Sequence, residues 1–221
     1  LAGQRSNRHS QSYPDSFIEW YEQAKECNSP DTTRFLLYYI YQPLYDWLMN
    51  DQLDRRQSNA NLRPVVYKAW KKVCEVSQLY LSKYYLGHHE VSLLADLAEE
   101  LKPVCQLMVS ENYYTKRRNC DNNQIYPHTI NKFLIDFINY YERTPEFTPT
   151  IILGCACGGS EIAFALAGIT GLPLKFVRFS KRRDDEQVHC LKEEEEEIQS
   201  MIKDRQVLVV EDFVDKHSRS H

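Results

Sequence analysis

The feature that most constrains the fold is a change of hydrophobic periodicity near residue 145. Before it, apolar residues recur every three or four positions, which is typical of amphipathic helices. After it, short apolar runs alternate with helical segments. The segment TPEFTPT, residues 144–150, separates the two patterns and contains two prolines. We therefore expect an all-α domain over residues 13–145 and an α/β domain over residues 150–221.

Five helices are predicted in the first domain, because capping residues or a first-turn proline precede stretches of helical periodicity. Gly87 is expected to end the third helix. A fourth helix is expected over residues 90–110, where the interior Pro103 predicts a kink or a break. A fifth is expected over residues 127–143. The residues expected to begin the first three helices are Asp15 or Ser16, Asp31 and Pro64.

The second domain reads as strand, helix, strand, helix and strand. Residues 151–153 form the first apolar run, and Ser160 is expected to cap the helix that follows, with Gly168 and Gly171 at its end. LPLKFVRFS and QVLVVED predict the second and third strands. This order predicts a parallel sheet with crossover connections, in which ligands bind at the carboxyl ends of the strands.

The connection between the second and third strands is charged and is predicted to be helical. It reads EQVHCLKEEEEEIQSMIKD, residues 186–204. The five consecutive glutamates, residues 193–197, are expected to form a solvated face of this helix, and the alternative is an acidic patch that binds a protein. Its apolar residues fall on one helical stripe: Val188, Leu191, Ile198 and Ile202.

Composition argues against several classes of protein. The net charge of -4 and the pI of about 6.0 give no general attraction to nucleic acid or to anionic membranes. No stretch approaches the roughly 20 apolar residues that span a bilayer. Seven cysteines without framework spacing indicate a reducing, cytoplasmic location. Residues 1–12 are polar, contain no signal peptide, and are expected to form a flexible arm.

Three loops follow predicted strands and are therefore expected at one edge of the sheet: GCACGG, SKRR and EDFVDKHS. The glycine pair of the first precedes a helix N-terminus, whose free N–H groups favour an anion. The alternative is a tight turn that needs a positive φ. Glu211 and Asp212 can accept hydrogen bonds from vicinal hydroxyls or hold Mg²⁺. The alternative for this pair is a solvent-exposed acidic strand end.

Together these loops resemble the type I phosphoribosyltransferase family, over residues 150–221. VLVVEDFVD resembles the family's motif for phosphoribosyl diphosphate (PRPP). GCACGGSEIA is similar to its pyrophosphate loop and the following helix, and PLKFVRFSKRR to its second strand, which ends in basic residues before a mobile hood. The resemblance implies a parallel-sheet phosphoribosyltransferase-like domain behind the helical domain.

The resemblance also implies roles for individual residues. Glu211 and Asp212 would contact the ribose 2′ and 3′ hydroxyls, with Mg²⁺ on the same face, and Asp215 would handle the proton of the acceptor base. These three acids are the expected catalytic residues, and Glu211 and Asp212 the expected metal ligands. Residues expected to lie against the pyrophosphate or to neutralise it are Cys157, Gly158, Gly159, Lys181, Arg182 and Arg183.

The phosphate loop of this chain differs from that of the family. The family has a Thr-Gly-x-Thr type turn whose backbone wraps the 5′-phosphate, whereas here the residues are Lys216, His217, Ser218 and Arg219. His217 stands where glycine is usual, so these side chains rather than a backbone nest would bind the phosphate. The family also continues past this loop with a helix and strands, so further residues or another arrangement would complete the sheet.

Two functions are therefore predicted. In the first, the chain binds PRPP or a related ribose phosphate with Mg²⁺ and transfers the phosphoribosyl group to a base or amine. In the second, the same fold acts without catalysis, as a nucleotide or PRPP sensor or as a protein or nucleic-acid interaction module. The helical domain would contact that partner. Lys116, Arg117 and Arg118 offer a local basic patch for single-stranded nucleic acid, or a solubilising loop. No membrane partner is expected, and self-association into a homo-oligomer is kept as an option.

Overall fold

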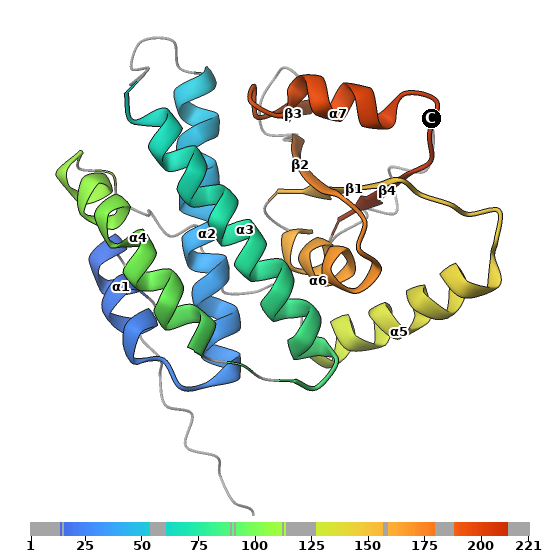
Figure 1. Ribbon diagram of the computed structural model, residues 1–221, viewed down its shortest axis with the longest axis horizontal. Helices are drawn as coiled ribbons and strands as arrows, with labels where there is room; N and C mark the ends of the chain where they lie inside the picture. Colours follow the sequence, from blue (N-terminus) through green and yellow to red (C-terminus); the bar gives the residue numbers. More distant parts are fainter. Residues whose placement is uncertain are drawn as a thin grey trace, which may run out of the picture.

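A layer of helices packs against one face of a four-stranded mixed sheet (Figure 1). The computed structural model describes residues 14, 16–53, 61–88, 90, 92–111, 113, 127–156, 159–179 and 188–211. A helical N-terminal region followed by an α/β region is therefore confirmed, while the phosphoribosyltransferase-like fold stays a prediction. The arm predicted over residues 1–12 lies outside the described residues. No helix among them is long and apolar enough to cross a membrane.

The five predicted N-terminal helices are present. Ser16 caps the first by accepting a hydrogen bond from the Glu19 N–H at 3.2 Å, and Gly87 follows the third with a φ of 84°. The fourth helix begins two residues later than predicted and continues through Pro103 without a break. The helices are α1 (Phe17–Glu26), α2 (Pro30–Leu53), α3 (Arg63–Tyr85), α4 (Ser92–Ser110) and α5 (Pro127–Arg143).

The three predicted strands are confirmed as parallel neighbours, and the structure adds a fourth strand. The order across the sheet is β3-β2-β1-β4, with β2 and β4 parallel to β1 and β3 antiparallel to β2. The strands are β1 (Ile151–Cys155), β2 (Leu174–Phe179), β3 (Val188–Cys190) and β4 (Val207–Val210). Helix α6 (Ser160–Thr170) connects β1 to β2, and α7 (Glu195–Ile202) lies between β3 and β4.

Two local predictions about these elements are wrong. The single helix expected over residues 186–204 is instead β3 followed by α7, because Val188 pairs with Phe179 of β2 and this tertiary pairing overrides the local helical pattern. Val188 is 62% exposed, so it does not share a buried stripe with Ile198. Ser160 is not the cap of α6 either. Gly159 occupies the N-cap position, and Ser160 is the buried first residue of the helix.

Five aromatic side chains join the helical region to the sheet, and we call them the aromatic cluster. They come from α2, α3, α6 and β2, all are buried, and neighbouring rings lie 5.0–6.4 Å apart between centroids. Such pairs add to the stabilisation that comes from buried apolar area. The cluster consists of Tyr41, Tyr45, Trp70, Phe164 and Phe176.

Close contact between α3 and α6 depends on Gly168. A Cβ atom at Gly168 would lie 2.5 Å from the Gln78 carbonyl oxygen and 2.6 Å from the Ser82 Cβ. Gly168 therefore lies inside α6 as a packing residue, whereas Gly171 ends the helix with a φ of 72°. Helices and sheet share one continuous hydrophobic core. Whether residues 13–145 and 150–221 are separate domains stays a prediction.

Candidate functional site

The carboxyl edge of β1 and β4 is the candidate site. These strands are direct neighbours, with Gly154 of β1 opposite Val210 of β4. The chain therefore leaves both strands at the same edge, where ligands bind in open parallel sheets. Two of the predicted site residues are described there: Gly159, in the loop after β1, and Glu211, which directly follows β4.

Gly159 lies directly against the end of β4. A Cβ atom at this position would be 2.3 Å from the Val210 carbonyl oxygen and 3.0 Å from the Glu211 Cα. Any side chain here would displace backbone that leads into the acidic pair. The φ of Gly159 is -76°, so close approach rather than a positive φ requires glycine at this position. The structure thus brings the end of the first loop against the start of the third.

The N-terminus of α6 lies at this junction. The Gly159 N–H donates to the Cys155 carbonyl oxygen at 3.0 Å, and the Gly159 carbonyl accepts from the Ala163 N–H at 3.0 Å. No side chain caps the helix. Backbone N–H groups in the first turn of a helix attract anions, because they lack partners within the helix and lie at the positive end of its dipole. This geometry is compatible with a diphosphate next to Glu211.

A partly buried carboxylate in the first turn of α6 was not predicted from the sequence. Glu161 forms an ion pair with Arg34 of α2 and accepts a hydrogen bond from the Tyr85 hydroxyl of α3 at 2.5 Å. Burial and the neighbouring Glu161 raise the pKa of Tyr85 far above its usual value, so the hydroxyl stays protonated and donates. The helical region therefore neutralises the one acidic side chain in the first turn of α6.

Most of the predicted site residues lie outside the part of the chain that the structure describes, and their roles stay predictions. Among the described residues, no group of three His, Cys, Asp or Glu side chains is placed to hold a metal ion. Of the predicted Mg²⁺ ligands, only Glu211 is described. The predicted site residues outside the described part are Cys157, Gly158, Lys181, Arg182, Arg183, Asp212, Asp215, Lys216, His217, Ser218 and Arg219.

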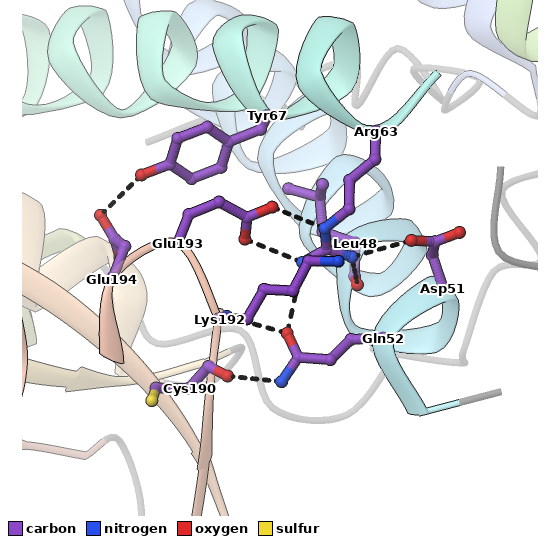
Figure 2. Close-up of polar contacts among 9 residues, drawn as sticks. All are labelled: Leu48, Asp51, Gln52, Arg63, Tyr67, Cys190, Lys192, Glu193 and Glu194. Carbon is purple, nitrogen blue, oxygen red and sulfur yellow. Dashed lines mark hydrogen bonds and ion pairs between the residues drawn. The ribbon is translucent and has the colours of Figure 1, made fainter. Parts of the chain in front are cut away.

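A second cluster of polar residues, which we call the ionic cluster, has two parts. Arg63 makes most of the contacts in the first part (Figure 2). The Arg63 guanidinium donates to both carboxylate oxygens of Glu193, at 2.5 and 2.8 Å. It also donates to the Leu48 carbonyl at 2.7 Å and to the Asp51 carboxylate at 2.9 Å. Gln52 binds the backbone from the end of β3 onward, by donating to the Cys190 carbonyl and accepting from the Lys192 N–H. These contacts fasten that segment to α2 and α3.

The rest of the ionic cluster surrounds Lys175, the second residue of β2. Its ammonium donates to Glu194 at 3.0 Å and to Glu197 at 2.5 Å. Burial lowers the pKa of Lys175, but the two carboxylates outweigh this and raise it above its usual value. Lys71 and Tyr67 of α3 also donate to Glu194, each at 3.4 Å.

The prediction that residues 193–197 form a solvated face is therefore wrong for Glu194. It is 1% exposed, because it pairs with the buried Lys175. Glu193 stays at the surface, although its carboxylate makes a bidentate contact with Arg63. A signal was present in the sequence, since a lysine between the apolar residues Leu174 and Phe176 of a strand needs an acidic partner if it is buried. The sequence did not indicate which of the five glutamates would supply it.

The chain was compared with known protein families, curated proteins and solved structures. No protein-family model matches the chain, and no curated protein or solved structure matches it significantly. The resemblance to phosphoribosyltransferases therefore rests on the quoted motifs alone. The structure contributes the spatial arrangement of two of the motif segments, at Gly159 and at Glu211.

Proposed function

We propose that the carboxyl edge of β1 and β4 binds PRPP or a related ribose phosphate with Mg²⁺, and that bound PRPP donates its phosphoribosyl group to a base or amine. The observation that carries the proposal is the contact between Gly159 and the backbone of Val210 and Glu211. It joins the two segments that resemble the family's pyrophosphate loop and PRPP motif. In such a ligand, the diphosphate and the ribose hydroxyls are also adjacent.

In the proposed complex, the diphosphate lies at the first-turn N–H groups of α6. Glu211 and Asp212 accept hydrogen bonds from the ribose hydroxyls; they would also hold Mg²⁺, which would supply positive charge beside the diphosphate. A nitrogen nucleophile attacks C1 of the ribose, and the bond between C1 and the diphosphate oxygen breaks. Pyrophosphate leaves with the electron pair, and Asp215 accepts the proton of the nucleophile. Such a reaction depends on positioning and charge stabilisation.

The ion pair between Arg34 and Glu161 supports an anion at this position. An unpaired carboxylate in the first turn of α6 would repel a diphosphate bound at the same helix end. Arg34 compensates that charge from α2, and its side chain is buried against Glu161. Glu161 therefore adds no unpaired negative charge at the N-terminus of α6.

Calorimetric titration of PRPP with excess Mg²⁺ tests the binding step. We expect the wild-type chain to bind, and Glu211→Ala to weaken binding at least about tenfold, the loss of roughly 1.4 kcal/mol that one charged hydrogen bond supplies. Glu196→Ala is the matched control, since Glu196 and Glu211 are both exposed glutamates. The control should bind as the wild type does. Absence of wild-type binding at millimolar ligand contradicts the proposal.

A second assay separates transfer from binding alone. Pyrophosphate release is measured over a panel of bases and amines with PRPP and Mg²⁺ present. Release that depends on Glu211 and on one acceptor supports a transferase. If PRPP binding depends on Glu211 but no acceptor leads to pyrophosphate release, the chain is a PRPP sensor and not a transferase.

A further inference from the structure

Helix α5 lies at the margin of the molecule, with its N-terminal end near α6 (Figure 1). Ile130 and Leu134 of α5 are buried in the core. Next to this buried side, Phe133 is 45% exposed and Tyr140 is 54% exposed. Exposed apolar side chains mark a contact surface when they gather into a contiguous patch.

These two aromatic residues alternate with charged residues along one side of α5. Phe133, Asp136, Tyr140 and Arg143 follow one another at spacings of three, four and three residues, so they lie along one side of α5. None of the ion pairs among the described residues involves Asp136 or Arg143. These four residues, from here on the α5 stripe, therefore present an aromatic, an acidic, an aromatic and a basic side chain in sequence.

Both exposed rings are held in place by other aromatic side chains. Phe133 stacks on Phe137 at 6.4 Å between centroids, and Phe137 stacks on Tyr141 at 6.0 Å. Tyr140 contacts Phe147, beyond the end of the helix, at 5.7 Å. A surface whose side chains are already ordered loses less conformational entropy when it binds a partner.

We propose that the α5 stripe pairs with the α5 stripe of a second copy of this chain, with the two helices antiparallel. In that orientation, each Arg143 lies over the partner's Phe133, and each Asp136 faces the hydroxyl of the partner's Tyr140. Arginine over an aromatic ring and hydroxyl to carboxylate are both favourable contacts. A two-fold axis makes each contact twice.

The charges favour a second copy over a lipid surface and set the orientation. Asp136 lies between the two aromatic residues, so a membrane that received Phe133 and Tyr140 would also bury this carboxylate without a partner. A parallel pair of helices would place each Asp136 beside the partner's Asp136 and each Arg143 beside the partner's Arg143. In the antiparallel arrangement, each Asp136 instead lies about one helical turn from the partner's Arg143.

One helix from each copy makes a small interface. Interfaces below about 1,200 Å² belong to weak or transient complexes. We therefore expect a dissociation constant on the order of 10 μM, and a monomer–dimer equilibrium that depends on protein concentration.

Sedimentation equilibrium of the full chain, over concentrations that bracket this constant, tests the proposal. Tyr140→Ser should raise the dissociation constant at least about tenfold, as expected for the loss of an interface aromatic. Ile135→Ser is the matched control, because Ile135 is also 54% exposed but lies about 200° around the helix from Phe133. It should leave the constant unchanged. A wild-type chain that stays monomeric, or an equal effect of both variants, overturns the proposal.

Exchange of the two charged residues distinguishes antiparallel pairing from non-specific association. Arg143→Asp removes the contact with the partner's Phe133 and places a carboxylate near the partner's Asp136, so dimerisation should be lost. Adding Asp136→Arg to this variant restores opposite charges and should recover part of the affinity. Thermal unfolding confirms that each variant is folded. No recovery in a folded double variant overturns the antiparallel pairing.

Discussion

Two consecutive residues of β2, Lys175 and Phe176, lie on opposite faces of the strand and enter two different environments. Phe176 belongs to the aromatic cluster and contacts rings from α2, α3 and α6. Lys175 belongs to the ionic cluster and pairs with Glu194 and Glu197. Both side chains are buried. The same strand is thus fixed to the rest of the protein by apolar packing on one face and by ion pairs on the other.

The two clusters contribute differently to the fold. Apolar packing stabilises in proportion to the area removed from water and has little directional preference. Buried ion pairs gain little net stability, because desolvation of the charges opposes their attraction. Their loss is nevertheless costly when one partner stays buried alone. We infer that the aromatic cluster supplies stability, whereas the ionic cluster fixes where the segment from Cys190 to Glu197 lies.

Removal of Phe176 should produce the largest loss of stability. Phe176→Ala leaves a cavity among four aromatic neighbours, and we expect a loss of about 3–5 kcal/mol in the free energy of unfolding. Urea denaturation followed by far-UV circular dichroism measures it. Phe133→Ala, at an exposed position and at low protein concentration, should cost less than about 1 kcal/mol. Equal losses at the two positions would show that the aromatic cluster is not the main source of stability.

Removal of Lys175 should rank second. Lys175→Met leaves Glu194 buried with only the weaker contacts to Lys71 and Tyr67. We expect a loss of about 3 kcal/mol at neutral pH, near the lower end for a broken buried ion pair. Lys203→Met, at an exposed position, should change the free energy of unfolding by less than about 0.5 kcal/mol.

A compensating substitution shows whether an unpaired charge causes this loss. Glu194→Gln added to Lys175→Met removes the buried negative charge, so we expect the double variant to regain more than half of the lost stability. If the double variant is as unstable as Lys175→Met, then lost packing of the lysine side chain explains the effect instead.

The sequence was sufficient to predict the helices and the parallel strands. The parallel strands follow from short apolar runs, and the helices from their periodicity and caps. Strand β3 could not be predicted, because its three residues form a strand only by pairing with β2. The ionic cluster could not be predicted either, because Arg63 and Glu193 are 130 residues apart in sequence.

The candidate site was predictable in its motifs but not in its contacts. Glycine at position 159 is visible in the sequence, whereas its reason, contact with Val210 and Glu211, exists only in the folded chain. The pairing of Arg34 with Glu161 likewise joins α2 to α6. No local pattern indicates it, because each residue also fits an exposed helical position.

The smallest expected effect is the pH dependence that Glu193 contributes. Burial raises the pKa of Glu193, but hydrogen bonds from Arg63 outweigh this and hold it below its usual value. A depressed pKa in the folded state contributes stability above the ordinary pKa of glutamate, about 4.3, and this stability is lost as pH falls through the folded-state value. Glu193→Gln should therefore be about 1 kcal/mol less stable at pH 7, and the difference from wild type should shrink in acid. Chemical denaturation between neutral pH and pH of about 3 measures this, with Glu196→Gln as the exposed control. A difference that stays constant with pH would show that shape rather than charge holds Glu193 to Arg63.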